Sequence, residues 1–201
     1  MTQTVDFIFD FASPNGYLAH KIVPEIEART GARFNYFPAL LGGLFKLSNN
    51  QPPMVAFGEV KGKLAYEQLE TRRFIAKHGL DKFTFNPHFP VNTLLVMRGL
   101  VAAEMDGQKM PYLEVVSKAM WEDEKKMDDP QVVADVLAAG GLDAERLMAR
   151  TQDAEVKQKL IDNTQAAADR GAFGIPFFFV GDEPFFGKDR LGQIEEMLSA
   201  S

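Results

Sequence analysis

The sequence contains no cysteine. This absence excludes a disulfide framework, a CxxC redox pair and a thiolate metal site, so any thiol that takes part in the chemistry must come from a ligand. Histidine is scarce too, and the spacing of His20, His78 and His88 matches no metal-binding motif. We therefore expect no metal site.

Other patterns are also missing. The chain has neither a GxGxxG motif nor a P-loop, so we expect no nucleotide cofactor. Its net charge is −6 and its basic residues form no stripe, which argues against a nucleic-acid partner. Its apolar runs are too short to span a bilayer, and Asp6 and Asp10 interrupt the stretch that a secretory signal would need. These absences indicate a cytoplasmic protein without a membrane partner.

The composition that remains is typical of a globular protein. Hydrophobic residues make up 46% of the chain and charged residues 25%, and the hydrophobic share includes 17 phenylalanines. A length of 201 residues suits one compact unit, or a core domain that carries an insertion.

The N-terminal part predicts a strand, a helix and a second strand. Residues 5–12 and 33–38 alternate as strands do, and apolar side chains recur at helical spacing between them. Thr30 and Gly31 end that helix, and Pro24 should kink it. Two strands joined by a helix form a βαβ unit.

The remaining sequence predicts a long helical part and then a return to strands. Strands are expected at 177–180 and 185–186, before a last helix with Asp189 as its N-cap. The helical patterns that precede them follow a loop at 48–53 and lie at 59–78, 92–106, 111–126, 130–139, 143–149 and 153–170. The order is therefore βαβ, a helical insertion and ββα.

The segment VDFIFDFASPNGY places Ser13 between the first strand and the first helix. A helix N-terminus has unpaired N–H donors and the positive end of the helix dipole, so it suits a thiolate, a phosphate or a carboxylate. The commoner role of such a serine is a plain N-cap. The three histidines are scattered and no GxSxG elbow is present, so we do not expect a serine nucleophile.

The element order, with an X-Pro step before the third strand, is that of the thioredoxin fold. Four segments, FDFASPNGYLA, LLGGLFKLSNNQPP, FGIPFFFV and GDEPFFGKDR, resemble 2-hydroxychromene-2-carboxylate isomerases and the related kappa-class glutathione transferases. The resemblance implies an α/β, thioredoxin-like fold built from residues 1–45 and 171–201, interrupted by an all-helical insertion domain of residues 46–170. It also implies glutathione as cofactor, a small aromatic substrate and a homodimer.

The resemblance assigns Ser13 as the catalytic residue, which holds the glutathione sulfur. A helix N-terminus and a hydroxyl donor both lower the pKa of a thiol, so the local chemistry agrees with this role. The backbone of Ile175 is implied to pair with the cysteinyl amide of glutathione, beside a cis peptide bond to Pro176. The other implied contacts are Phe186, Gly187, Lys188 and Asp189 at the γ-glutamyl end, and Lys46 and Asn50 toward glutathione or the substrate.

Several residues have two interpretations. Asn92 is a helix cap, which we favour, or a polar group that faces the substrate. Trp121 is a core residue or part of an aromatic pocket, and Asp10 is a buried group that fixes the site or one that transfers a proton. Gly16 stands where the family carries a second serine at the helix start, so one hydroxyl is missing there.

Three functions follow from this interpretation. The first is a glutathione-dependent cis–trans isomerase of an aromatic pyruvate such as 2-hydroxychromene-2-carboxylate. The second is a kappa-like transferase or peroxidase that uses the same site. The third is a thioredoxin-like binding module without catalysis, because fold does not imply function.

Overall fold

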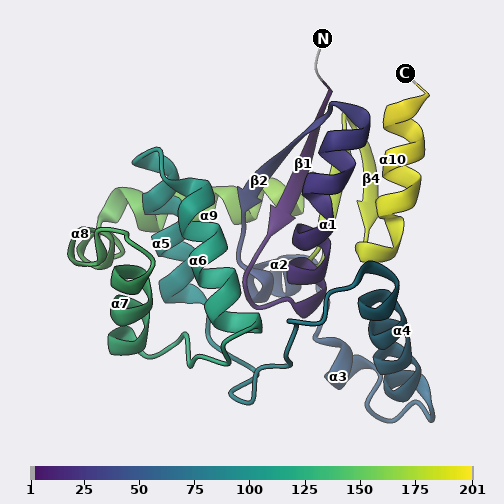
Figure 1. The fold of residues 1–201 in the computed structure, drawn as a ribbon, viewed down its shortest axis with the longest axis horizontal. Coiled ribbons are helices and arrows are strands. Elements are labelled where there is room, and N and C mark those ends of the chain that lie inside the picture. Colours follow the sequence, from purple (N-terminus) through teal and green to yellow (C-terminus); the bar gives the residue numbers. More distant parts are fainter. Residues whose placement is uncertain (1–2, 201) are drawn as a thin grey trace.

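The computed structural model describes residues 3–200, so residues 1, 2 and 201 of the two predicted thioredoxin-like segments lie outside the description. A four-stranded sheet forms its centre, in the order β2-β1-β3-β4. The strands are β1 (Thr4–Phe9), β2 (Arg33–Pro38), β3 (Phe177–Val180) and β4 (Glu183–Phe186). Strands β1 and β2 are parallel, whereas β3 is antiparallel to both β1 and β4. The predicted βαβ and ββα halves therefore meet in one sheet (Figure 1).

Alternation along β1 separates two hydrophobic clusters. Val5, Phe7 and Phe9 point to the larger cluster, and Ile8 to the smaller one on the other face. The ring of Phe7 lies 4.5 Å from that of Phe178 on the neighbouring strand, measured between centroids. The predicted strand over 5–12 is too long at its end, because the Asp10 carboxylate accepts the N–H of Ala12 and forms a turn.

Helix α1 (Pro14–Thr30) crosses one face of the sheet and packs against α10 (Leu191–Ser199) (Figure 1). Ser13 caps its start and Pro14 occupies its first position, where a missing N–H costs nothing. Gly31 ends the helix with a φ of 72°, a left-handed conformation that glycine adopts without steric penalty. These boundaries agree with the prediction.

The insertion is helical, as predicted, but its boundaries differ. The predicted helix over 111–126 ends at Trp121, because the carbonyls of Met120 and Trp121 accept hydrogen bonds from Asn86 and Thr84 instead of continuing the helix. The helices are α2 (Leu41–Leu47), α3 (Pro53–Ala56), α4 (Lys63–His78), α5 (Leu94–Met105), α6 (Lys109–Trp121), α7 (Pro130–Ala139), α8 (Ala144–Arg150) and α9 (Ala154–Asp169).

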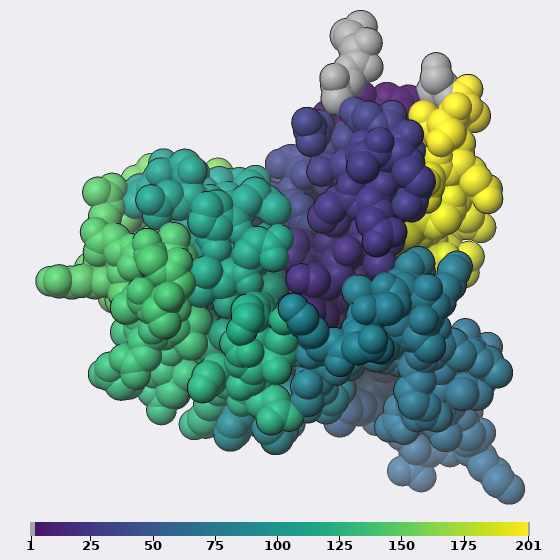
Figure 2. Space-filling model, in the orientation of Figure 1, coloured from purple at the N-terminus to yellow at the C-terminus, as the bar shows by residue number. Residues whose placement is uncertain are grey.

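The large hydrophobic cluster continues from the sheet into the insertion, where it includes Leu100, Trp121 and Leu160. The segment with α3 and α4 behaves differently, since neither helix contains a buried residue. Figure 2 shows this segment projecting from the body of the molecule. No helix within residues 3–200 is long and apolar enough to cross a membrane.

The C-terminal helix corrects one prediction. Asp189 is not the N-cap, because it lies inside a 3₁₀ turn, η1 (Lys188–Arg190), and α10 begins only at Leu191 without a side-chain cap. Strand β4 also begins earlier than predicted, at Glu183, and includes Pro184. A proline is tolerated there because β4 is an edge strand.

Candidate functional site

Ser13 lies at the N-terminus of α1 with 5% of its surface exposed. Its Oγ accepts the Gly16 N–H at 3.0 Å, so the plain capping role is real. The same hydroxyl donates to the Ile175 carbonyl oxygen at 2.9 Å, across 162 residues of sequence. Ser13 can therefore present its proton at the junction of α1 and the loop before β3.

The Ile175–Pro176 bond is cis, as predicted. Ile175 is 6% exposed, and its backbone N–H has no hydrogen-bond partner among residues 3–200. An unpaired N–H in a buried loop is costly unless a ligand or water accepts it. This donor, next to the Ser13 hydroxyl, fits a peptide-like ligand such as the cysteinyl unit of glutathione.

Asn50 reaches the same loop. Its side-chain amide donates to the Phe173 carbonyl oxygen at 2.9 Å, and its Oδ1 accepts the Gln51 N–H at 2.8 Å. Lys46 lies in the last turn of α2 and is exposed, without a hydrogen bond or ion pair among the described residues. Asn50 therefore already supports the Ile175 loop, whereas the Lys46 ammonium is free to meet an anion.

The residues predicted to bind the γ-glutamyl end of glutathione contact the loop that carries the cis-proline. The Gly187 N–H donates to the Pro176 carbonyl oxygen at 3.0 Å, and the φ of 99° at Gly187 requires glycine. Phe186 is 46% exposed and its ring lies 4.6 Å from that of Phe173. The segment that carries Lys188 and Asp189 is thus tied directly to the cis-proline.

Lys188 is buried, contrary to the ordinary expectation for a surface lysine. Its ammonium lies 3.5 Å from the Asp189 carboxylate and 5.2 Å from the centre of the Phe74 ring on α4. The Asp189 side chain is 62% exposed. Both residues line a hollow of about 520 Å³ between α1, α4 and α10. Asp189 is therefore accessible to a cationic group such as an ammonium.

Asn92 stands apart from these residues. Its Oδ1 accepts the Leu94 N–H at 3.0 Å, at the first residue of α5. The N-cap of α5 is Thr93, so the favoured interpretation of Asn92 as the cap is wrong by one residue; Asn92 forms the turn that leads into the helix. Trp121 is likewise a core residue, 1% exposed, with its indole N–H donating to the Phe11 carbonyl oxygen at 3.0 Å.

Asp10 is almost completely buried, with 1% of its surface exposed. Its carboxylate accepts the N–H groups of Ala12 and Leu41 and the Thr93 hydroxyl. Burial raises the pKa of Asp10, and these three hydrogen bonds oppose the rise. The sequence predicted that Asp10 is buried, but its partners Leu41 and Thr93 carried no local signal.

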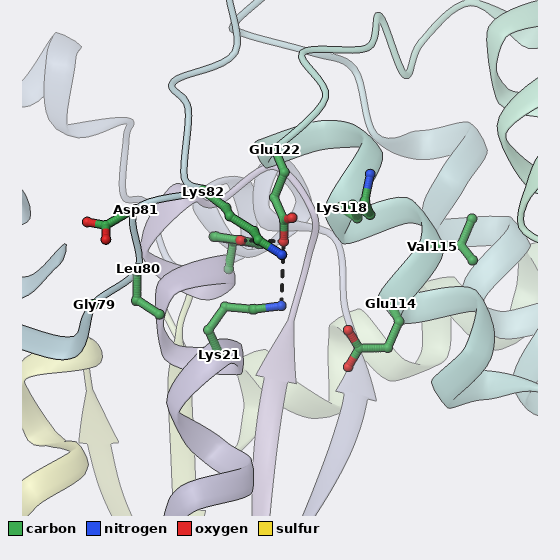
Figure 3. A pocket seen from close by; sticks show the side chains of 10 residues that line it. Lys21, Gly79, Leu80, Asp81, Lys82, Glu114, Val115, Lys118 and Glu122 are labelled. Atoms are coloured by element: carbon green, nitrogen blue, oxygen red, sulfur yellow. Dashed lines mark hydrogen bonds and ion pairs between the residues drawn. The ribbon is translucent and has the colours of Figure 1, made fainter.

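A second hollow, of about 590 Å³, lies between α1, α6 and the turn at 79–82 (Figure 3). There the Tyr17 hydroxyl donates to the Glu122 carboxylate at 2.8 Å, and the Lys21 ammonium lies 3.5 Å from the same carboxylate. Burial raises the pKa of Tyr17, so its hydroxyl keeps its proton. None of the predicted site residues lines this hollow, although Tyr17 is one turn beyond Ser13.

The structure therefore brings most of the predicted site together. Ser13, Asn50, Ile175, Pro176 and Gly187 are linked directly or through Phe173, which the sequence did not single out. No group of histidine, aspartate and glutamate suited to a metal ion occurs in the described part of the chain. The donors present suit an organic anion with a peptide-like backbone.

Comparisons with known proteins extend this result. A solved structure of a 2-hydroxychromene-2-carboxylate isomerase matches with a TM-score of 0.82 at 27% identity, covering 98% of this chain and 95% of that one. The isomerase of that name from Sphingobium xenophagum is 29% identical, over 98% of this chain and 99% of that protein. Glutathione S-transferase kappa 1 from Rattus norvegicus is 28% identical, over 98% of this chain and 91% of that protein.

A family model described as a DSBA-like thioredoxin domain matches residues 4–199. The predicted α/β thioredoxin-like fold with a helical insertion, and the resemblance seen in the sequence, are both confirmed. Since this match runs through the sheet and the helical insertion alike, the chain belongs to the DSBA-like thioredoxin domain family, and isomerases and kappa-class transferases are among its relatives.

Proposed function

We propose that this chain is a glutathione-dependent isomerase of an aromatic pyruvate such as 2-hydroxychromene-2-carboxylate. The observation that carries the proposal is the Ser13 hydroxyl at the start of α1, 2.9 Å from the carbonyl oxygen before the cis-proline. The names of the relatives support the same chemistry. A buried hydroxyl without an adjacent base is suited to hold a thiolate and not to attack.

Glutathione would supply a thiolate that adds to the conjugated double bond, permits rotation about it and leaves again. The Ser13 hydroxyl would donate to the sulfur in place of the Ile175 carbonyl and so stabilise negative charge there, with help from the α1 dipole. The free Ile175 N–H would donate a hydrogen bond to the cysteinyl carbonyl oxygen, and the Asp189 carboxylate would pair with the γ-glutamyl ammonium. Lys46 and Asn50 would orient the carboxylate of the substrate, and Asn92 is the third polar residue that we propose for substrate binding.

A kappa-like transferase or peroxidase is the second candidate, supported by the similarity to rat glutathione S-transferase kappa 1. It would use the same serine. A binding module without catalysis is the third, because family membership alone does not establish an activity. We place the protein in the cytoplasm in each case.

Calorimetry with glutathione, followed by product analysis, tests these alternatives. Isomerisation should leave the amount of glutathione unchanged, whereas conjugation consumes it and peroxide reduction oxidises it. We expect binding and turnover of the aromatic pyruvate with no net loss of glutathione. Absence of glutathione binding, together with binding of an extended peptide, would favour the non-catalytic module.

We also propose that the chain forms a homodimer through the projecting segment. Its apolar side chains expose roughly 600 Å², close to the ~800 Å² that each partner of a stable pair buries. They are Met54, Val55, Phe57, Val60 and Tyr66, together with Leu47 from the adjoining end of α2, each 40% to 66% exposed. Light scattering should give the mass of two chains, and Val55→Glu should give one. Ile161→Glu, at a residue of α9 that is 57% exposed, is the matched control.

A further inference from the structure

Asp10 connects three segments that are far apart in the sequence. Its Oδ1 accepts the Ala12 N–H at 2.9 Å and the Thr93 hydroxyl at 2.7 Å, and its Oδ2 accepts the Leu41 N–H at 2.8 Å. No lysine, arginine or histidine of the described chain forms an ion pair with it. The carboxylate is therefore held by neutral donors alone, and both of its oxygens are occupied.

Two of the three donors begin a segment that carries a predicted site residue. Ala12 directly precedes Ser13, and Leu41 is the first residue of α2, which leads through Lys46 to Asn50. The Thr164 hydroxyl adds support at the same end of α2, since it accepts the Leu40 N–H at 3.0 Å. The position of α2 relative to Ser13 is therefore set by two buried side chains.

The far end of this segment is fixed as well. The Asn50 amide holds the Phe173 carbonyl, and two residues later the Ile175 carbonyl accepts the Ser13 hydroxyl. Three hydrogen bonds and the backbone segments between them thus form a closed ring. It runs from the Ser13 turn through Asp10, α2, Asn50 and Phe173 back to Ser13. Asp10 is the one side chain in this ring that joins the Ser13 turn to α2.

We propose that Asp10 is a positioning residue that sets the α2–Asn50 segment against the Ser13 turn, and so fixes the width of the glutathione site. The inference rests on the proposed function. Proton transfer is a poor alternative, because the residue is 1% exposed and both carboxylate oxygens already accept hydrogen bonds from the protein. Its role passes through Ser13 and Asn50.

An amide cannot replace this carboxylate. Asparagine has one oxygen, so an Asp10→Asn side chain that still accepts from Ala12 and Thr93 turns its NH₂ group toward the Leu41 N–H. Two donors then face each other at the start of α2. The substitution keeps the shape of the residue but breaks the link to α2, which makes it the appropriate test.

The experiment measures glutathione binding by calorimetry in Asp10→Asn, Thr164→Val and Thr151→Val. We expect binding about tenfold weaker in Asp10→Asn and about threefold weaker in Thr164→Val, because each removes a buried acceptor at the start of α2. Thr151→Val should bind as the wild type does, since Thr151 is a buried threonine at the end of α8 whose hydroxyl bonds, within residues 3–200, to Met148 and Gln152 alone.

Two further readouts separate positioning from other roles. Amide hydrogen exchange without any ligand should rise in residues 41–50 of Asp10→Asn and stay unchanged in Thr151→Val. The ultraviolet absorbance of the thiolate should show the bound thiol ionising at higher pH in Asp10→Asn than in the wild type. If Asp10 acted through its charge instead, removal of that charge would move the ionisation to lower pH.

The outcomes keep the two proposals distinct. Unchanged exchange in residues 41–50 of Asp10→Asn, or a thiol that ionises at lower pH, overturns the positioning role. Wild-type protein that does not bind glutathione overturns the proposed function, while the exchange measurement still decides whether Asp10 positions α2.

Discussion

The two ends of the candidate site are built differently. At the Ser13 end, Ser13 and Ile175 are 5% and 6% exposed and already contact each other. At the other end, Lys46 is exposed without a polar partner among the described residues, and the Asp189 side chain is 62% exposed. Buried, fixed donors act on a ligand without reorganisation, whereas exposed charges must be ordered and are screened by salt. The buried end should therefore dominate the energetics.

The largest effect is expected for Ser13→Ala. Loss of the only hydroxyl at the start of α1 should lower turnover about 100-fold or more, because it removes the donor to the sulfur anion. The lost cap should cost only about 1 kcal/mol of folding stability. Steady-state kinetics and thermal unfolding measure both, with Ser13→Thr as the control that keeps a hydroxyl. Near wild-type turnover in Ser13→Ala would contradict the assignment.

A middle effect is expected for Asn50→Ala. Asn50 is exposed but holds the Phe173 carbonyl, so it belongs in part to the buried end. Its loss should weaken glutathione binding about tenfold, as removal of one hydrogen bond that orders a loop does. Gln51→Ala is the neighbouring control, because the Gln51 side chain makes no hydrogen bond to the described chain. Equal effects of the two variants would remove Asn50 from the site.

A smaller effect is expected for Asp189→Asn. The exposed carboxylate should contribute about fivefold to glutathione binding at low salt, and this contribution should fall as ionic strength rises. Asp182→Asn, on the turn between β3 and β4, removes the same charge away from Lys188 and should leave binding unchanged. A salt-independent loss in Asp189→Asn would indicate that this end of the site is as rigid as the other.

The smallest effect is expected for Lys46→Gln. Loss of this exposed, unpaired ammonium should raise the KM for an anionic substrate about two- to threefold, because it removes an attractive charge. Thermal stability should not change. Lys61→Gln, at another exposed lysine without a polar partner in the described chain, is the control. A large fall in kcat for Lys46→Gln would place this lysine at the reacting atoms. The exposed end of the site would then contribute more than the buried end.

The same contrast separates what could be predicted from what could not. Ser13 and Gly31 mark the ends of α1 by local chemistry, so the sequence predicts that helix correctly. Asp189 looks like a cap by the same rule, but the Gly187 bond to the Pro176 carbonyl shapes the segment into a 3₁₀ turn instead. Helix α2 contains Gly42 and Gly43 and has no side-chain cap of its own, so no local signal marks its start.

The sequence by itself determined the strands, the long helices and the placement of a serine at a helix N-terminus, because periodicity and capping act over a few residues. Its lack of cysteine determined that a reactive sulfur must be borrowed. Tertiary structure alone decided that Asp10 meets Leu41 and that Asn50 meets Phe173, because these contacts span 31 and 123 residues. Only folding brings their donors and acceptors together, and burial then makes each unmet hydrogen bond costly.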